Sequence, residues 1–312
     1  MSKLNAATTL AMFPGQGSQY VGMGRQLLSE FPGCKVAFEE GEDAAKINIR
    51  KLCLDGPEEE LKLTANTQPC ILTVSAATWL VLEQEAGFKA QWFAGHSLGE
   101  YSALVGAGKL ALGRAAFLVR RRGEAMQAAV PAGTGAMAAV MGVAPEALQA
   151  RAAEISRPGS VVEVVNFNSP QQLVVAGHKA AVEDVVKALE ADKARCVMLP
   201  VSAPFHSSLM TKAREAMEPL LRDTPLCDSP VKVIANRTGK IENPYQIQHL
   251  IEQIDHSVLW TQTLESAVAT GCTDFVEIGP GKVLTGLAKR QIPKDARLIH
   301  SDDIKAAITS LI

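Results

Sequence analysis

A serine flanked by two glycines is the residue of this sequence best suited to nucleophilic chemistry. Residues 95–99 follow the pattern G-x-S-x-G with Ser97 at its centre, between an apolar run over 91–94 and a helix-like stretch over 100–105. Strand, sharp turn and helix is the setting that lifts such a serine clear of the backbone. The free amides of the following helical turn can stabilise negative charge on a carbonyl oxygen. The pattern therefore indicates a serine that attacks a carbonyl group, although a plain strand–helix connection could carry the same five residues.

A glycine-rich loop over 14–19 follows the first apolar run, residues 8–13. It has neither the G-x-G-x-x-G spacing of dinucleotide-binding proteins nor the Gly-Lys-Ser/Thr of a phosphate loop. At the carboxyl end of a parallel strand, such a loop offers backbone amides where ligands bind in open α/β folds. An ordinary strand–helix turn is the other interpretation, and the G-x-S-x-G motif favours the ligand-binding one.

Three consecutive arginines, Arg120, Arg121 and Arg122, lie in a predicted helix over 111–126. A run of like charges is usually a solvated helix face. Adjacent helical positions point about 100° apart, so only some of the three can face the interior. A guanidinium that does so can bind a carboxylate through two parallel hydrogen bonds.

The composition is that of a globular chain, with 47% hydrophobic and 21% charged residues. A net charge of -2 argues against a nucleic-acid protein, and no apolar run reaches the length needed to span a membrane. Six cysteines without a C-x-x-C pair, and a first segment without an export signal, predict reduced thiols in the cytoplasm. We take a monomer as the default.

The apolar pattern around the serine motif predicts a large α/β domain. Strands are expected at residues 8–13, 91–94, 231–235 and 275–278. Helices are expected at 24–39, 57–63, 70–86, 111–126 and 283–289. Residues 64–69 read as a turn, with Pro69 suited to the first turn of the helix that follows.

From residue 135 the pattern changes to short strands that alternate with helices. The expected order is strand 136–142, helix 145–155, strands 161–167 and 173–176, helix 180–191 and strand 195–201. This β-α-β-β-α-β order is that of a ferredoxin-like unit. We therefore predict a large domain, residues 1–132 and 203–312, with a small ferredoxin-like domain, residues 133–202, inserted into it.

The extended string from Gly95 to Leu104 resembles the active-serine motif of the malonyl-CoA:acyl carrier protein transacylases, the acyltransferase family of fatty acid and polyketide synthesis. Further strings resemble the same family, at residues 13–19, 64–69, 201–210 around His206, 256–260 and 279–282. The resemblance extends from Phe13 to Gly286. It implies an α/β-hydrolase-like large domain with a parallel-sheet core, the same inserted subdomain, and an active site in the cleft between the two.

The resemblance also implies roles for individual residues. Ser97 would be the nucleophile, and His206 would be the base that takes its proton. The backbone N–H groups of Gln16 and Leu98 would form the oxyanion hole. Arg122 would bind the free carboxylate of a malonyl group. Phe205 falls where an aromatic residue is associated with malonyl units, because a bulky ring fills the volume that an α-methyl group would need.

No acidic third member of a triad is expected. Asp255, Asp274 and Glu277 lie downstream of His206, but none sits in a triad-like motif, and we predict that all three are structural. In the family, main-chain carbonyls orient the histidine. The relevant stretch resembles residues 256–260 here, where some family members carry a polar side chain in place of Leu259. Leu259 can orient the histidine if only its carbonyl is needed, and cannot if the side chain is needed.

The resemblance therefore predicts a transfer of the malonyl group from malonyl-CoA to the phosphopantetheine thiol of holo acyl carrier protein. The reaction would follow a ping-pong sequence through a malonyl-serine intermediate. It would supply fatty acid synthesis and require no metal ion or cofactor other than the coenzyme A thioester that is its substrate. Two enzymatic alternatives remain open: a free-standing, trans-acting polyketide acyltransferase, and a serine thioesterase or hydrolase. A third is a degenerate acyltransferase that serves only as a docking module.

Overall fold

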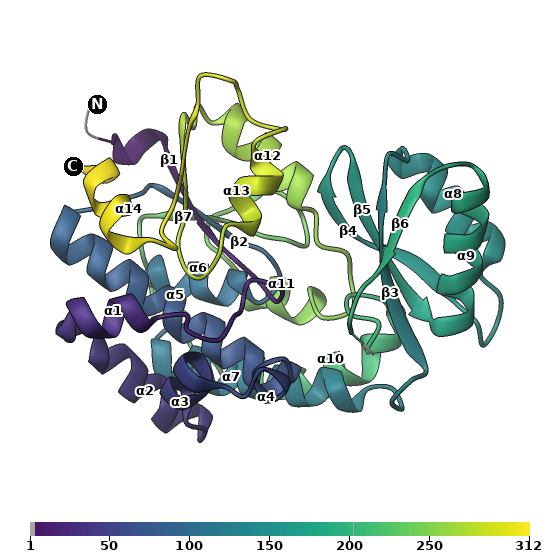
Figure 1. The fold of residues 1–312 in the computed structure, drawn as a ribbon, viewed down its shortest axis with the longest axis horizontal. Helices are drawn as coiled ribbons and strands as arrows, with labels where there is room; N and C mark the ends of the chain where they lie inside the picture. Colours follow the sequence, from purple (N-terminus) through teal and green to yellow (C-terminus); the bar gives the residue numbers. More distant parts are fainter. Residues whose placement is uncertain (1–3, 202) are drawn as a thin grey trace.

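The computed structural model describes residues 4–201 and 203–312, and its strands form two separate sheets (Figure 1). The larger sheet has six strands in the order β10-β9-β1-β2-β7-β8, and the smaller has four in the order β4-β5-β3-β6. The small sheet and its two helices lie together at the right of Figure 1. The predicted fold class, a mostly parallel α/β sheet with an inserted antiparallel unit, is confirmed. No helix in these two described ranges is long and apolar enough to cross a membrane.

The large sheet is parallel except at one edge. Its strands are β1 Thr9–Phe13, β2 Trp92–Gly95, β7 Lys232–Ile234, β8 Ile241–Glu242, β9 Asp274–Glu277 and β10 Arg297–His300. Only β8 runs antiparallel to its neighbour. Phe13 pairs with Gly95 at the ends of β1 and β2, so the loops that follow both strands leave the sheet side by side. These loops are the glycine-rich loop and the serine motif.

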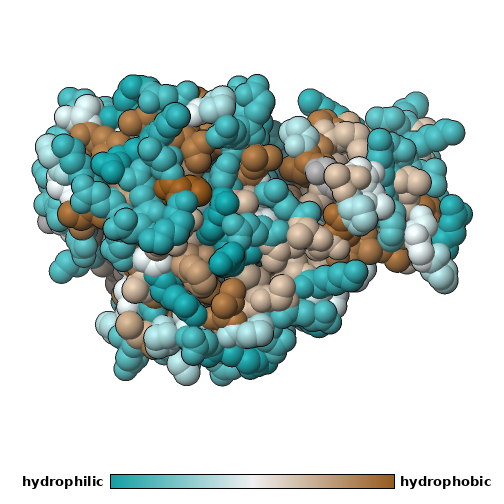
Figure 2. Space-filling view, turned by 90° about the horizontal axis from the view of Figure 1, so that it is seen from below, coloured by the Kyte–Doolittle hydropathy of each residue, from teal (hydrophilic) through white to brown (hydrophobic). Residues whose placement is uncertain are grey.

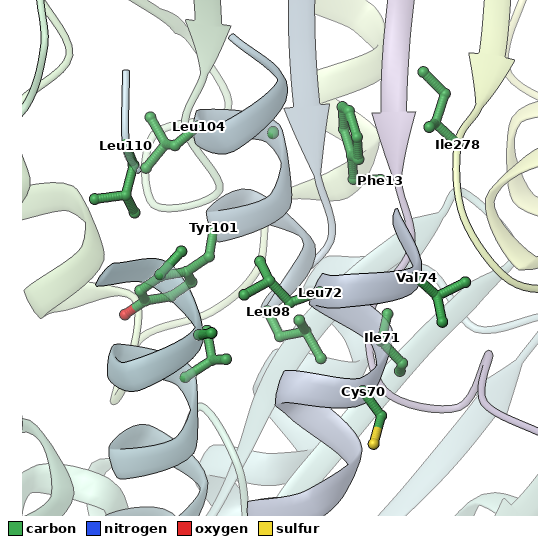
Figure 3. Packing of buried hydrophobic residues seen from close by; sticks show 14 of the residues in the cluster. Phe13, Cys70, Ile71, Leu72, Val74, Leu98, Tyr101, Leu104, Leu110 and Ile278 are labelled. Atoms are coloured by element: carbon green, nitrogen blue, oxygen red, sulfur yellow. The ribbon is translucent and has the colours of Figure 1, made fainter. Parts of the chain in front are cut away.

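Helices cover both faces of this sheet, as parallel sheets require. They are α1 Arg25–Glu30, α2 Lys35–Ala45, α3 Ile49–Asp55, α4 Glu58–Leu61, α5 Thr64–Ala86, α6 Gly99–Gly106, α7 Leu112–Ala128, α10 Thr211–Arg222, α11 Ile247–Glu252, α12 Trp260–Ala269, α13 Val283–Ala288 and α14 Ile304–Leu311. Three 3₁₀ helices add Ala6–Thr8, Pro32–Cys34 and Ser208–Met210. In Figure 3, Leu72 of α5 lies against Leu98, beside Tyr101 of α6. This packing holds in place the helix that follows the serine.

Helix α5 differs from the prediction, because it begins at Thr64 and not at Cys70. Pro69 lies inside the helix, where a proline cannot donate to the carbonyl four residues earlier. The Arg120 guanidinium on α7 donates to that carbonyl, the one of Ala65, at 3.1 Å. The predicted turn over 64–69 was wrong because a partner distant in sequence satisfies the group that the proline leaves free. The predicted helix over 24–39 is also interrupted, at Pro32.

The inserted unit has the predicted order of elements. It consists of β3 Gly135–Met141, α8 Pro145–Ile155, β4 Val162–Ser169, β5 Gln172–His178, α9 Lys179–Ala191 and β6 Arg195–Met198. All its strand pairs are antiparallel, and a separate cluster of buried residues forms its core. The domain limits 1–132, 133–202 and 203–312 stay a prediction; residues 1–3 and the limit at residue 202 lie outside the described residues.

The small sheet is attached to the large domain through the edge strand β4. Val258, just before α12, pairs with this edge: its N–H donates to the Val165 carbonyl at 2.9 Å, and its carbonyl accepts from the Phe167 N–H at 3.0 Å. Ser257 adds a side-chain hydrogen bond to the Val164 carbonyl at 2.8 Å. These bonds hold the small domain beside the carboxyl ends of β1 and β2.

Candidate active site

Ser97 sits on a turn with almost no free space around it. Its φ of 53° lies in the left-handed region, which side chains other than glycine rarely adopt. A Cβ on Gly95 would lie 1.9 Å from the Gly99 carbonyl oxygen, and a Cβ on Gly99 would lie 2.1 Å from that of Phe13. Both flanking glycines are therefore required by close backbone contacts, as the elbow interpretation of the motif predicts.

His206 lies within hydrogen-bonding distance of the serine. Its Nε2 is 2.8 Å from Ser97 Oγ, and its Nδ1 is 2.8 Å from the main-chain oxygen of Gln253. A carbonyl oxygen can only accept, so in the neutral ring Nδ1 carries the hydrogen. The lone pair of Nε2 then faces the Ser97 hydroxyl. This arrangement lets the imidazole take the serine proton.

The orienting carbonyl is that of Gln253, and the expectation of Leu259 was wrong. The Leu259 carbonyl accepts from the Thr263 N–H at 2.9 Å, at the start of α12, and its side chain packs against the core of the small domain. The main chain turns back toward His206 before this point, at the end of α11. Within the stretch identified by resemblance, the backbone of His256 also acts on His206: it raises the pKa of the imidazole, against the larger lowering by burial.

The three downstream acids all bind elsewhere, in line with the prediction that they are structural. Asp255 pairs with Arg214 and His256, and Asp274 pairs with Arg297. Glu277 accepts from the backbone N–H groups at the start of α13. None of the three has a hydrogen bond to His206.

Arg122 is the arginine that points inward, with 1% of its surface exposed. Its Nη2 donates to Ser97 Oγ at 3.1 Å and to Gln253 Oε1 at 2.8 Å, and its Nη1 donates to Gln68 Oε1 at 3.0 Å. Among the described residues its Nε has no hydrogen-bond partner, and no carboxylate forms an ion pair with the guanidinium. A buried cation with only neutral partners, next to a nucleophile, is suited to receiving an anionic substrate group.

The N–H groups of Gln16 and Leu98 have no acceptor in the part of the chain that the structure describes. The glycine-rich loop packs directly against the serine turn. A Cβ on Gly15 would lie 2.4 Å from the His96 carbonyl oxygen, so only glycine fits there. Two unpaired amides beside a nucleophile are what an oxyanion hole needs.

All six residues singled out from the sequence line one cavity of about 170 Å³. The large domain contributes Gln16, Ser97, Leu98, Arg122, Phe205 and His206, and the small domain contributes Met137, Asn166, Asn168 and Val174. In Figure 2 a notch separates the two domains, and hydrophobic residues gather beside it. The cavity therefore lies between the two domains, where the resemblance implied an active site.

Three further residues support the site without having been singled out. Asn236 accepts from the Ser97 N–H and donates to the Gly95 carbonyl, both at 2.6 Å, and so braces the turn. Gln253 supplies the carbonyl to His206 and an amide oxygen to Arg122. Glu100 is buried between them. Only Glu100 carries a local signal in the sequence, since it falls within the active-serine string.

Burial, and next the positive charge of Arg122, lower the pKa of His206 from 6.5 to about 3. We expect the ring to stay neutral, in its Nδ1–H form, from pH 8 to pH 5. ¹⁵N NMR of the imidazole would show this directly; a titration near pH 6.5, or the Nε2–H form, would contradict it. Since an unfolded chain takes up this proton below pH 6.5, stability should fall from that pH toward pH 3.

Comparison with known proteins assigns this site to a family. The family model described as "Acyl transferase domain" matches residues 11–307. The malonyl CoA-acyl carrier protein transacylase of Escherichia coli (strain K12) is 45% identical over 282 residues, which are 89% of this chain and 91% of that one.

Solved structures agree. FabD from Acinetobacter baumannii superposes with a TM-score of 0.94 at 38% identity, covering 98% of this chain and 99% of its own. A malonyl-transacylase solved in complex with its holo type II PKS acyl-carrier protein reaches a TM-score of 0.91 at 39% identity, covering 97% and 98%. The chain therefore belongs to the acyl transferase domain family, among the malonyl CoA-acyl carrier protein transacylases.

Proposed function

We propose that this protein transfers the malonyl group of malonyl-CoA to the phosphopantetheine thiol of acyl carrier protein, and so supplies fatty acid synthesis. The observation that carries the proposal is the buried Arg122 guanidinium 3.1 Å from Ser97 Oγ. An esterase has no need of a cation at this place. An enzyme that selects an acyl group with a free carboxylate does, because the guanidinium gives that carboxylate a charged partner.

In the first half-reaction, His206 Nε2 takes the proton of Ser97 as Oγ attacks the thioester carbonyl. The N–H groups of Leu98 and Gln16 donate to the oxyanion, and one such donor is typically worth about 10²–10³ in rate. The carbon–sulfur bond then breaks, and the coenzyme A sulfur leaves with the proton from His206. The malonyl group remains as an ester on Ser97, with its carboxylate on Arg122.

In the second half-reaction, the phosphopantetheine thiol of the carrier protein gives its proton to His206 and attacks the malonyl ester. Ser97 leaves and takes the proton back. These steps need neither a metal ion nor a cofactor, because Ser97, His206 and two backbone amides supply the nucleophile, the base and the anion stabilisation. We propose that the protein acts as a monomer in the cytoplasm, without nucleic-acid or membrane partners.

The alternatives are less well supported. A hydrolase would stand apart from relatives that carry the transacylase name. A trans-acting polyketide acyltransferase is not favoured, because identity to the E. coli transacylase, 45% over 282 residues, exceeds the 38% over 291 residues to the polyketide biosynthesis malonyl CoA-acyl carrier protein transacylase of Bacillus subtilis (strain 168).

Phe205 gives a prediction about substrate shape. The side chain is 9% exposed and lines the cavity. Phe205→Ala should admit methylmalonyl-CoA, raising its rate relative to malonyl-CoA by about tenfold, as one methyl group in an apolar pocket is worth. Competition between the two thioesters, with acyl-serine products resolved by mass, measures the ratio. An unchanged ratio would remove the steric argument.

The proposed function is tested by intact-protein mass after brief mixing with malonyl-CoA. We expect a gain of one malonyl group, which added holo carrier protein removes. Free coenzyme A without an adduct would indicate a hydrolase. Neither an adduct nor coenzyme A release would mean that the proposed substrate is wrong.

A further inference from the structure

We propose that Glu100 is a positioning residue, which fixes the orientation of the Gln253 side-chain amide and thereby the place of the Arg122 guanidinium. The inference rests on the proposed role of Arg122 in binding the malonyl carboxylate. Glu100 does not contact the cavity, and nothing in the reaction steps above uses it. Its hydrogen-bonded link to Arg122 runs through the Gln253 side chain. Burial lowers the pKa of Arg122, and the charge of the Glu100 carboxylate also acts on the guanidinium, against this lowering.

Glu100 lies in the first turn of α6 with none of its surface exposed. Its Oε1 accepts from the Tyr245 hydroxyl at 2.8 Å and from the Asn236 main-chain N–H at 3.2 Å. Its Oε2 accepts from Gln253 Nε2. Both carboxylate oxygens are thus occupied by donors, which an acceptor-only group can accommodate and an amide cannot.

Only one orientation of the Gln253 side-chain amide forms hydrogen bonds with all of its neighbours. Its Nε2 donates to Glu100 Oε2 and, at 3.0 Å, to the Ser97 carbonyl, while its Oε1 accepts from Arg122 Nη2 at 2.8 Å. Turning the amide over would set an oxygen against two acceptors and an NH₂ group against the guanidinium. Glu100 is one of the two acceptors that exclude the reversed amide, and the only one that belongs to a side chain.

The orientation of the Gln253 amide requires a hydrogen-bond acceptor at Glu100 Oε2 and does not require a negative charge there. Burial raises the pKa of Glu100 to about 7, against the lowering effect of its hydrogen bonds and of Arg122. A proton on Oε1 can be donated to the Tyr245 oxygen, which leaves Oε2 free to accept from Gln253. Both ionisation states therefore hold the amide of Gln253 in the same sense.

Glu100→Gln tests the inference with almost no change of shape. The Asn236 main-chain N–H cannot turn and keeps the new amide oxygen on its side, so the new NH₂ group faces Gln253 Nε2. Gln253 must then turn and present its own NH₂ group to Arg122. We expect acyl-enzyme formation from malonyl-CoA to fall about 10- to 100-fold, mainly through KM, and that from acetyl-CoA to change less than about twofold.

Two other variants complete the design. Gln253→Met removes the side-chain amide but keeps the main-chain carbonyl that orients His206; we expect the same malonyl-specific loss, and no further loss of preference when Glu100→Gln is added to it. Glu277→Gln is the matched control, because it makes the same change at a buried carboxylate that binds only α13. It should leave the malonyl preference unchanged.

The measurements are acyl-enzyme formation from each thioester and the melting temperature of each variant. An unchanged malonyl preference in Glu100→Gln overturns the inference, and so does an equal loss for both acyl groups, which indicates a merely structural role. If Glu100→Gln does not fold, an unchanged preference in Gln253→Met overturns it and a malonyl-specific loss supports it. Failure of the wild-type protein to take malonyl would instead contradict the proposed function.

Discussion

A Ser97→Ala variant is expected to form no malonyl-enzyme and to lose about 10⁶-fold in kcat, the cost of removing the nucleophile from a serine–histidine pair. The hydroxyl is the group that His206 and Arg122 both contact, and among the described residues no other serine lines the cavity. Intact-protein mass with malonyl-CoA, and transfer to holo carrier protein, measure the two losses. A malonyl adduct of normal yield in Ser97→Ala would place the nucleophile elsewhere.

Ser102→Ala is the matched control for this experiment. Ser102 lies on the same helix, α6, and is buried, but its hydroxyl has no hydrogen-bond partner among the described residues. The variant removes the same atom a short distance from the site. It should retain rates within about twofold of wild type, as expected for a change outside the reacting groups. A large loss in Ser102→Ala would mean that packing, not nucleophilicity, explains the effect at Ser97.

Arg122→Ala is expected to reverse the acyl preference. Removing one partner of a buried charge pair should lower malonyl-enzyme formation by about 10³-fold. The acetyl group has no free carboxylate that Arg122 could bind, so the rate of acetyl-enzyme formation should stay the same or rise. The ratio of the two acyl-enzymes, formed in competition and resolved by mass, reports the change. If both rates fall by the same factor, Arg122 supports the structure of the site and does not select malonyl.

Arg121→Ala controls for the charge change. Arg121 is adjacent in sequence, but its side chain is 55% exposed, and its partners, the Glu124 carboxylate and the Phe117 ring, both belong to α7. Exposed pairs of this kind contribute little to stability. The variant should therefore keep both the malonyl preference and the melting temperature of the wild-type chain.

Much of the fold was readable from the sequence because its signals are local. The ferredoxin-like unit showed its alternation of strands and helices within a continuous stretch, 135–201. The turn at Ser97 requires glycine two residues before and two residues after the serine, and the G-x-S-x-G motif contains both glycines. The six candidate residues, all of which line the cavity, came from such motifs and from the family resemblance.

What the sequence did not predict depends on contacts between distant segments. Helix α5 could include Pro69 only because Arg120 approaches from α7. Asn236 and Gln253 act through hydrogen bonds to Gly95, Ser97 and His206, far from them in the chain, and neither belongs to a recognisable motif. Strands β8 and β10 are short and lie at the two edges of the large sheet, where the apolar pattern is weak.

The main-chain partner of His206 affects how this site can evolve. If an aspartate side chain bound His206 Nδ1, a single substitution could remove that partner. A main-chain carbonyl remains whichever amino acid occupies position 253. The carbonyl of residue 253 depends on the course of the main chain and not on a side chain. A substitution scan would therefore identify Ser97 and His206 as essential and would not detect the third group that acts with them. Drift at position 253 would alter which acyl group is chosen long before it disturbed proton transfer, so substrate choice and catalysis are free to diverge separately.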